Sequence, residues 1–194
     1  MQIMRIFSSA SHKGTKGYLD SQKKFEVIRT VLYFGISISL FAAGWITTKS
    51  RLNLLTVVAV LGCLPASKSA VQMIMHLRYK SLSEKACSEI EDHCVGMTVL
   101  YDMVFTSYDK NFSIGHMTIK GNTIVGYTED QKFDEKAFQT HIDQILKKEY
   151  ITGISIKVFS DLKKYTKRLQ ELRELDVDEI MTDNVISTLL SVSL

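Results

Sequence analysis

Proline, cysteine and glycine are scarce in this sequence. The 194 residues include one proline, three cysteines and ten glycines. The chain is therefore neither collagen-like nor of low complexity, and it is not a secreted scaffold built from disulfides. Neither sign of charge dominates, and the net charge of +3 gives no general attraction for nucleic acid. With 45% hydrophobic residues, the chain is expected to fold rather than to stay disordered.

Two long apolar runs lie in the first half of the chain. Residues 30–48 carry no charge, and a helix of that length spans about 28 Å, close to the thickness of a bilayer's hydrocarbon core. Residues 52–76 form a second run, which Lys68 interrupts and in which Pro65 predicts a kink. We predict a transmembrane helical hairpin over residues 30–76, with helices at about 30–48 and 52–76. A buried helical hairpin of a soluble protein is the alternative.

Basic residues flank this hairpin on its outer ends. A basic N-terminal tail, residues 1–29, precedes the first run, and further basic residues follow the second, whereas the link carries only Lys49 and Arg51. The positive-inside rule then predicts a multi-pass protein of the bacterial plasma (inner) membrane with both termini cytoplasmic. The residues expected to contact the membrane surface are Lys23, Lys24, Arg29, Lys68, Arg78 and Lys80.

Small residues recur every fourth position in both apolar runs. The stripes are Gly35, Ser39 and Ala43 in the first run, and Gly62, Ala66 and Ala70 in the second. Small residues let two helix backbones approach closely in lipid, so these six are expected to be helix-packing residues. We expect the hairpin to close on itself through them, with a homodimer through the same faces as the alternative.

The C-terminal part is expected to form a stalk helix, residues 77–95, and an α/β (α+β) cytoplasmic domain, residues 96–194. The order from the stalk onward is α-β-β-β-α-β-α-α, attached to the two-helix hairpin. In the first strand Met97, Val99, Tyr101, Met103 and Phe105 alternate, which predicts that they share one face. Asp134 and Ser160 are the predicted N-caps of the two helices that follow them.

Residues from about Glu84 to Ser160 resemble a nuclease-related domain of the restriction-endonuclease-like superfamily. Glu84 or Glu89 matches the acid of that family's first helix, and Ile114-Gly115-His116 matches its Ile-Asp-His strand. Gly115 stands where the resemblance implies a metal-binding aspartate, and Val125-Gly126-Tyr127 stands where it implies acid-x-Lys. Hydrolysis in that family needs the carboxylates to hold Mg²⁺, so the resemblance implies a degenerate copy without the metal-site motif.

Other groupings of reactive residues carry weaker signals. Cys87, His93 and Cys94, with His76 upstream, match no paired zinc-ligand spacing, which favours packing. Cys94 with His116 as a thiol nucleophile has no supporting motif. We therefore expect no catalytic residue, no cofactor and no metal ion.

The sequence favours a non-catalytic binding or assembly domain over an enzyme. Its expected partners are the lipid bilayer and a membrane-associated protein, with nucleic acid not favoured. The alternative is a membrane-tethered nuclease-like hydrolase whose metal ligands are Glu89, Asp102 and Glu129.

Overall fold

The computed structural model describes residues 13–49, 53–94, 96–174 and 179–194. These residues form two compact units. The described residues of 19–80 make up the first unit, called here the hairpin. Residues 13–18 together with the described residues of 81–194 make up the second, called here the α/β domain. The α/β domain thus contains chain from both sides of the hairpin in sequence.

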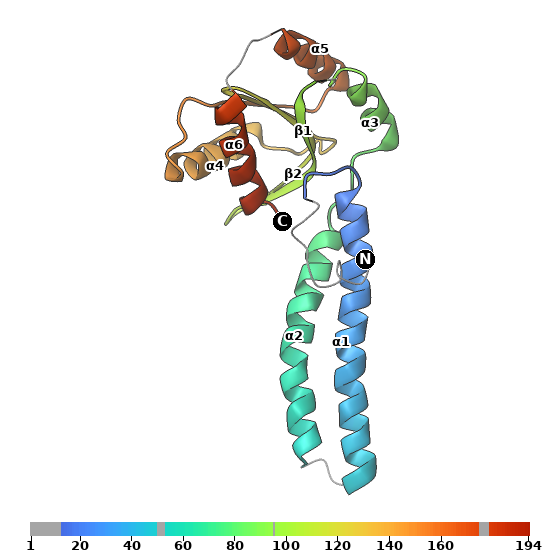
Figure 1. The fold of residues 1–194 in the computed structure, drawn as a ribbon. Coiled ribbons are helices and arrows are strands. Elements are labelled where there is room, and N and C mark those ends of the chain that lie inside the picture. Colours follow the sequence, from blue (N-terminus) through green and yellow to red (C-terminus); the bar gives the residue numbers. More distant parts are fainter. Residues whose placement is uncertain (1–12, 50–52, 95, 175–178) are drawn as a thin grey trace. The chain divides into compact units, whose positions relative to one another are not determined.

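The hairpin consists of two long antiparallel helices, α1 (Tyr18–Thr48) and α2 (Leu54–Leu77), drawn in blue and green in Figure 1. Asn53 caps α2 through its side chain, which accepts a hydrogen bond from the backbone N–H of Thr56. Both helices are long and apolar enough to cross a membrane, as expected. Because α1 begins at Tyr18, part of the expected N-terminal tail is helical. Residues 1–12 of that tail and residues 50–52 of the link lie outside the described residues.

The expected stalk helix is not formed. Helix α2 ends at Leu77, and a separate short helix, α3 (Glu84–Glu91), begins after a non-helical stretch. Ser83 has an extended backbone, and the backbone N–H of Leu82 donates to the carboxylate of Asp102 at 3.0 Å rather than to a helical carbonyl. Helix α3 buries Ile90 within the α/β domain. It is therefore an element of that domain and not a continuation of α2.

The α/β domain is built on a four-stranded sheet in the order β1-β2-β3-β4. The strands are β1 (Thr98–Thr106), β2 (Asn111–Lys120), β3 (Thr123–Tyr127) and β4 (Ser155–Phe159). The first three form an antiparallel meander, and β4 returns parallel to β3 after helix α4 (Glu135–Lys148). The predicted mixed class is confirmed, and the predicted order of elements agrees in part.

Helices cover both faces of this sheet (Figure 1). Helices α4 and α6 (Glu179–Val192) pack on one face, and α3 and α5 (Leu162–Arg173) pack on the other. The first core is all apolar and includes Phe105, Phe138 and Leu189. The second core surrounds Tyr165 and contains Cys94 and Leu169. The domain therefore has three layers and two separate apolar cores.

Strand β1 changes face in its middle, contrary to the predicted alternation. Met97 and Val99 pack in the second core, whereas Met103 and Phe105 lie in the first. The change occurs at Asp102, whose φ of +53° lies in the left-handed region. Pairing with β2 keeps the same register on both sides of this residue. A residue with positive φ shifts the alternation by one position, which no pattern of apolar residues reveals.

Both outer edges of the sheet are covered. On β1 the backbone N–H of Tyr101 donates to the carbonyl of Gly14 at 2.9 Å, and the N–H of Leu194 donates to the carbonyl of Val104 at 2.8 Å. On β4 two side chains of α4 take this role. Gln139 donates to the carbonyl of Ile156 at 2.9 Å, and Glu135 accepts from the N–H of Val158 at 3.3 Å. Neither edge offers these groups to another strand.

Candidate functional site

The exterior of the hairpin is the largest apolar surface among the described residues. Nineteen of the 21 exposed large hydrophobic residues belong to α1 or α2, and the other two are Tyr108 and Tyr150. In the most apolar window of each helix only 17% of the residues are buried. A core helix of a soluble protein would bury most of such a window. Exposed apolar patches of this size mark surfaces that meet lipid or another protein.

A polar network joins α1 and α2 at one end of the hairpin. Arg29 forms an ion pair with Glu26 on its own helix and donates to Ser69 and Gln72 on α2. The hydroxyls of Thr30 and Ser69 lie 2.9 Å apart in a buried hydrogen bond. Glu26 is 3% exposed. The network fixes the two helices at one level, because each buried group has a partner across or along the hairpin.

The expected membrane-surface residues differ in their surroundings. Lys24, Lys68, Arg78 and Lys80 are exposed, whereas Lys23 pairs with Asp20 at 2.8 Å. Arg29 is engaged in the polar network, and its side chain is only 17% exposed. Its contact with the membrane surface stays a prediction, as does that of the other five.

The small residues that hold the hairpin together are partly different from those expected. On α2, Gly62 and Ala66 face α1, and a Cβ at Gly62 would lie 2.8 Å from the hydroxyl of Ser37. On α1 the expected stripe of Gly35, Ser39 and Ala43 is exposed, and nothing lies within 4 Å of a Cβ at Gly35. The contact face of α1 instead runs through Thr30, Ser37 and Gly44. Within the hairpin, α1 therefore does not pack on α2 through the expected stripe, whose role as a helix-packing surface stays a prediction, and Ala70 is half-buried.

A buried polar cluster lies between the sheet and α5. Nδ1 of His116 on β2 and the hydroxyl of Tyr165 on α5 share a hydrogen bond of 2.6 Å. The same hydroxyl lies 3.3 Å from that of Thr118, and the thiol of Cys94 lies 3.8 Å from Nε2 of His116. The ring of Tyr101 contacts the imidazole edge to face. His116 and Tyr165 are both fully buried.

Burial keeps every member of this cluster neutral. It lowers the pKa of His116 to about 4 and raises the pKa of Cys94 to about 11. It also raises the pKa of Tyr165. A thiol nucleophile needs a thiolate, which a neighbouring imidazolium normally stabilises. The pKa values move in the directions opposite to those that a thiolate–imidazolium pair needs, and the hydrogen bond between His116 and Tyr165 holds β2 against α5.

A second group of reactive side chains lies at the edge of the domain. Lys16 forms an ion pair of 2.9 Å with Glu91, whose carboxylate accepts a hydrogen bond from the thiol of Cys87 at 3.4 Å. Lys16 also interacts with that thiol. The pKa of Cys87 is raised, chiefly by burial, and the pKa of Glu91 is lowered, chiefly by its hydrogen bond from Lys16. Cys87 is 1% exposed, so its thiol is shielded from solvent.

The residues of the alternative hydrolase are not assembled into a metal site. Asp102 is buried beside the backbone of Leu82, Glu129 accepts a hydrogen bond from Ser83, and Glu89 is exposed on α3. Across the described residues, no group of three His, Cys, Asp or Glu side chains could hold a metal ion. Cys87, His93 and Cys94, whose spacing matches no zinc pattern, belong to no such group either.

The position that the resemblance assigns to a metal-binding aspartate is filled by a neighbour. A Cβ at Gly115 would lie 2.8 Å from Cδ1 of Leu82. A carboxylate at this position would therefore require Leu82 to move. The nuclease-related resemblance itself stays a prediction.

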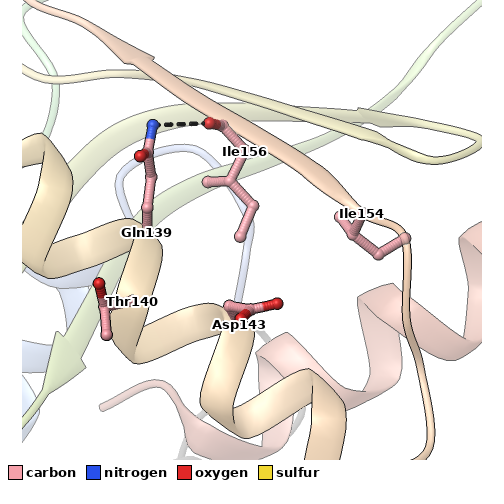
Figure 2. Close-up of a pocket in the computed structure, with 5 residues that line it drawn as sticks. All are labelled: Gln139, Thr140, Asp143, Ile154 and Ile156. Carbon is pink, nitrogen blue, oxygen red and sulfur yellow. Dashed lines mark hydrogen bonds between the residues drawn. The ribbon is translucent and has the colours of Figure 1, made fainter.

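A shallow depression of about 270 Å³ lies where α4 meets β4 (Figure 2). Its lining residues are Gln139, Thr140, Asp143, Ile154 and Ile156. The polar side chains already have partners: Gln139 bonds to Ile156, Thr140 to the carbonyl of Lys136, and Asp143 to Lys147. The depression therefore directs no free polar group toward a ligand.

Sequence reasoning missed the central residue of the buried cluster. In the sequence, Tyr165 is one member of a helical apolar stripe. Only its hydroxyl indicates a polar partner, because a buried hydroxyl needs a hydrogen bond. Lys16 lies far from its ion-pair partner Glu91 in sequence, so no local pattern links them. No protein-family model, curated protein or solved structure matches this chain.

Proposed function

We propose that the chain is an integral membrane protein of the bacterial plasma membrane whose hairpin anchors a non-catalytic α/β domain at the cytoplasmic face. The observation that carries this proposal is the distribution of exposed apolar side chains. They cover α1 and α2 and are nearly absent from the described surface of the α/β domain. Residues such as Ile46 and Leu54, which are 78% and 79% exposed, would be costly in water and favourable in lipid.

The contacts within the hairpin support a membrane boundary near its polar network. Thr30 meets Ser69 at one end, and Gly44 meets Asn53 and Leu55 near the other. Lys68 therefore lies at the level of Arg29 and Thr30 rather than in the middle of the apolar layer. The stretch from Asn53 to Lys68 spans about 23 Å, and the long lysine side chain can extend its ammonium toward the headgroups.

The pairing of Gly14 with Tyr101 supports the proposed topology. Gly14 precedes α1 and Tyr101 follows α2, yet both lie in one folded domain. Two segments that fold together must lie on the same side of a membrane. Both flanks of the hairpin then share a compartment, and their excess of basic residues favours the cytoplasm.

Two exposed tyrosines support a binding role for the domain. Tyr108 in the loop between β1 and β2 and Tyr150 at the end of α4 are 102% and 95% exposed. Tyrosine is enriched among the residues that dominate protein–protein interfaces. A partner in the same membrane would meet the tethered domain at a raised effective concentration.

Labelling of single cysteines tests the topology. A membrane-impermeant maleimide added to intact spheroplasts is expected to modify a Lys49→Cys variant and not a Tyr108→Cys variant. After permeabilisation both variants should react. The unmodified chain, in which Cys63 is half-buried and Cys87 and Cys94 are buried, gives the background. Modification of Tyr108→Cys in intact spheroplasts, or release of the chain from membranes by alkaline carbonate, would overturn the proposal.

Cross-linking tests the binding role separately. A photoreactive phenylalanine analogue at position 108 is expected to form one discrete protein adduct in native membranes, and the same analogue at the exposed Lys136 should form none. Equal adducts at both positions, or none at either, would contradict a docking surface at Tyr108.

A further inference from the structure

The outer edge of β4 carries two residues whose backbone groups face away from the sheet. Ser155 and Phe159 form backbone hydrogen bonds on the β3 side. Successive residues of a strand point their backbone groups in opposite directions, so those of Ile156 and Val158 face outward. Side chains of α4 bond to the carbonyl of Ile156 and to the N–H of Val158. Within the residues that the structure describes, the N–H of Ile156 and the carbonyl of Val158 have no partner, so this edge keeps one donor and one acceptor open.

The cover that α4 gives to this edge consists of side chains alone. Gln139 donates to the carbonyl of Ile156 at 2.9 Å and to the carboxylate of Glu135 at 3.2 Å, and Glu135 accepts from the N–H of Val158 at 3.3 Å. Hydrogen bonds of this kind contribute little net stability, because water or another partner replaces them when they open. Rotation of the two side chains would therefore expose the edge without any change in the helix.

The depression of about 270 Å³ between α4 and β4 lies beside this edge (Figure 2). Ile154 and Ile156 line it from the strand, and both are only partly buried. The polar side chains of Thr140 and Asp143 line it from the helix and are bonded elsewhere on α4. The unused contacts of the depression are therefore apolar, and they suit an apolar side chain on the α4 face of an added strand.

The opposite face of β4 presents a positive charge. Lys157 is exposed, and its Nζ lies 5.2 Å from the centre of the Phe159 ring. Among the ion pairs of the described residues none involves Lys157. Side chains of opposite charge stabilise neighbouring strands when they lie side by side on one face. An acidic residue on this face of an added strand would therefore be favoured.

We propose that the edge of β4 binds an extended segment of a partner protein, which joins the sheet as a further strand. The N–H of Ile156 donates to this segment, and the carbonyl of Val158 accepts from it. An apolar residue of the segment enters the depression, and the residue next to it is acidic and lies beside Lys157. The inference rests on the proposed binding role of the α/β domain, to which it adds the chemistry of the partner at a site separate from Tyr108.

A second copy of the chain fits this edge less well than a free segment does. The hydrogen bonds of Gln139 and Glu135 to β4 show that α4 reaches the edge of the sheet. Two copies paired through β4 would bring two such helices against each other. The β1 edge of a second copy is also covered, by Gly14 and Leu194. An extended segment brings no helix to the edge and leaves its own backbone groups available.

Selection from a displayed library of random peptides about ten residues long tests the site. The target is the full chain in bilayer discs. Enriched peptides are expected to alternate apolar with acidic residues and to slow the hydrogen exchange of the β4 backbone, measured by mass spectrometry. Lys157→Glu should shift the selection from acidic toward basic peptides, because the charge beside the added strand is reversed.

Two substitutions on α4 are expected to act in opposite directions. Thr140→Trp fills the depression and should weaken binding of the enriched peptides about tenfold. Gln139→Ala should strengthen it about fivefold, because the peptide no longer has to displace a hydrogen bond. Lys148→Trp is the matched control for the added indole, since Lys148 is exposed on the flank of α4 that faces His141 and should leave binding unchanged. Exchange of the β3 backbone shows whether each variant is folded.

The outcomes separate the possible occupants. A selection without enriched peptides, or binding that Thr140→Trp leaves intact, would overturn the proposal. Weaker binding by Gln139→Ala would mean that the side chain contacts the peptide and that the edge is not opened. If exchange of β4 slows with rising protein concentration in the absence of peptide, the occupant is a second copy. Failure of the proposed function would appear separately, in the cysteine labelling and in the cross-linking at position 108.

Discussion

The hydroxyl of Tyr165 and Nδ1 of His116 share a hydrogen bond of 2.6 Å at a site where both residues are fully buried. One residue lies on α5 and the other on β2, so the bond joins a helix to the middle of the sheet. The Tyr165 hydroxyl also lies 3.3 Å from that of Thr118, whereas Nδ1 of His116 depends on Tyr165.

Removal of the hydroxyl should therefore be costly. Tyr165→Phe leaves Nδ1 of His116 buried without this partner, and the loss of stability should be about 1–3 kcal/mol. Urea unfolding of the detergent-solubilised chain, followed by near-ultraviolet circular dichroism of the tyrosines, measures it. Tyr108→Phe, at an exposed position, should cost nothing measurable. Equal stability of the two variants would contradict the role given to this bond.

Stability should fall as the pH drops below neutrality. The pKa of His116 is lowered by burial to about 4, from 6.5. Between these values the unfolded chain binds a proton and the folded chain does not, so stability is full above pH 6.5 and is lost toward pH 4, by at most about 3 kcal/mol. His116→Gln should flatten this dependence. Part of what remains comes from His141, whose pKa is also lowered by burial, and part from Glu91, whose pKa is lowered by its hydrogen bond from Lys16. The same urea experiment at several pH values measures the change, and an unaltered slope in the variant would contradict it.

The hairpin should tolerate a side chain at Gly35 but not at Gly44. A Cβ at Gly44 would lie 2.7 Å from Oδ1 of Asn53 and 2.9 Å from Cβ of Leu55, and Gly35 has open space. Gly44→Val should destabilise the hairpin by about 1–3 kcal/mol. Titration with sodium dodecyl sulfate, followed by the fluorescence of Trp45, the sole tryptophan, gives the midpoint. A lower midpoint for Gly35→Val instead would place the packing on the face that the sequence suggested.

Removal of one partner of the buried ion pair should destabilise the hairpin more than removal of both partners. Arg29→Leu leaves the carboxylate of Glu26 buried and uncompensated, at a cost of about 3–5 kcal/mol. The double variant Glu26→Leu/Arg29→Leu should recover most of this loss, because no charge stays buried. Detergent titration of the single and double variants measures the coupling, with the exposed Lys24→Leu as the control. Additive effects would mean that the two side chains act independently.

The side chains that cover β4 should protect the domain from self-association. Glu135→Ala/Gln139→Ala frees the carbonyl of Ile156 and the N–H of Val158 at the sheet edge. We expect the double variant to lose about 1–2 kcal/mol of stability and to form larger species in size-exclusion chromatography in detergent. Thr140→Ala is the control, because the Thr140 hydroxyl donates only to a carbonyl of its own helix. Its stability and its elution volume should equal those of the unmodified chain.

Local signals in the sequence predicted many of the helices and strands, but not the contacts that these helices and strands make. The carboxylate of Asp134 caps α4 as expected, because it accepts from the N–H of Ala137. The cap of α5 is Asp161 and not Ser160, one residue later, since the Asp161 carboxylate accepts from two backbone N–H groups. Both residues are good caps, and only the point where β4 ends decides between them.

Long-range contacts explain what the sequence could not predict. The expected stripe of α1 and its observed contact face both contain small residues, and the choice of Ser37 and Gly44 over Gly35 depends on which residues of α2 lie opposite. The break before α3 depends on the hydrogen bond from the N–H of Leu82 to the carboxylate of Asp102. The whole of α3 lies between these two residues in sequence. Contacts of this kind are set by the tertiary fold, and helical periodicity does not predict them.

The pairing of Gly14 with Tyr101 closes a loop that encloses both apolar helices. During synthesis Gly14 leaves the ribosome first, and it can pair with Tyr101 only after the whole hairpin has been synthesised. If only one of the two helices crossed the bilayer, glycine and tyrosine would lie on opposite sides of the membrane, and this loop could not close. On the proposed topology, closure of this loop therefore requires that both helices have been inserted, and it becomes possible only after both have been synthesised.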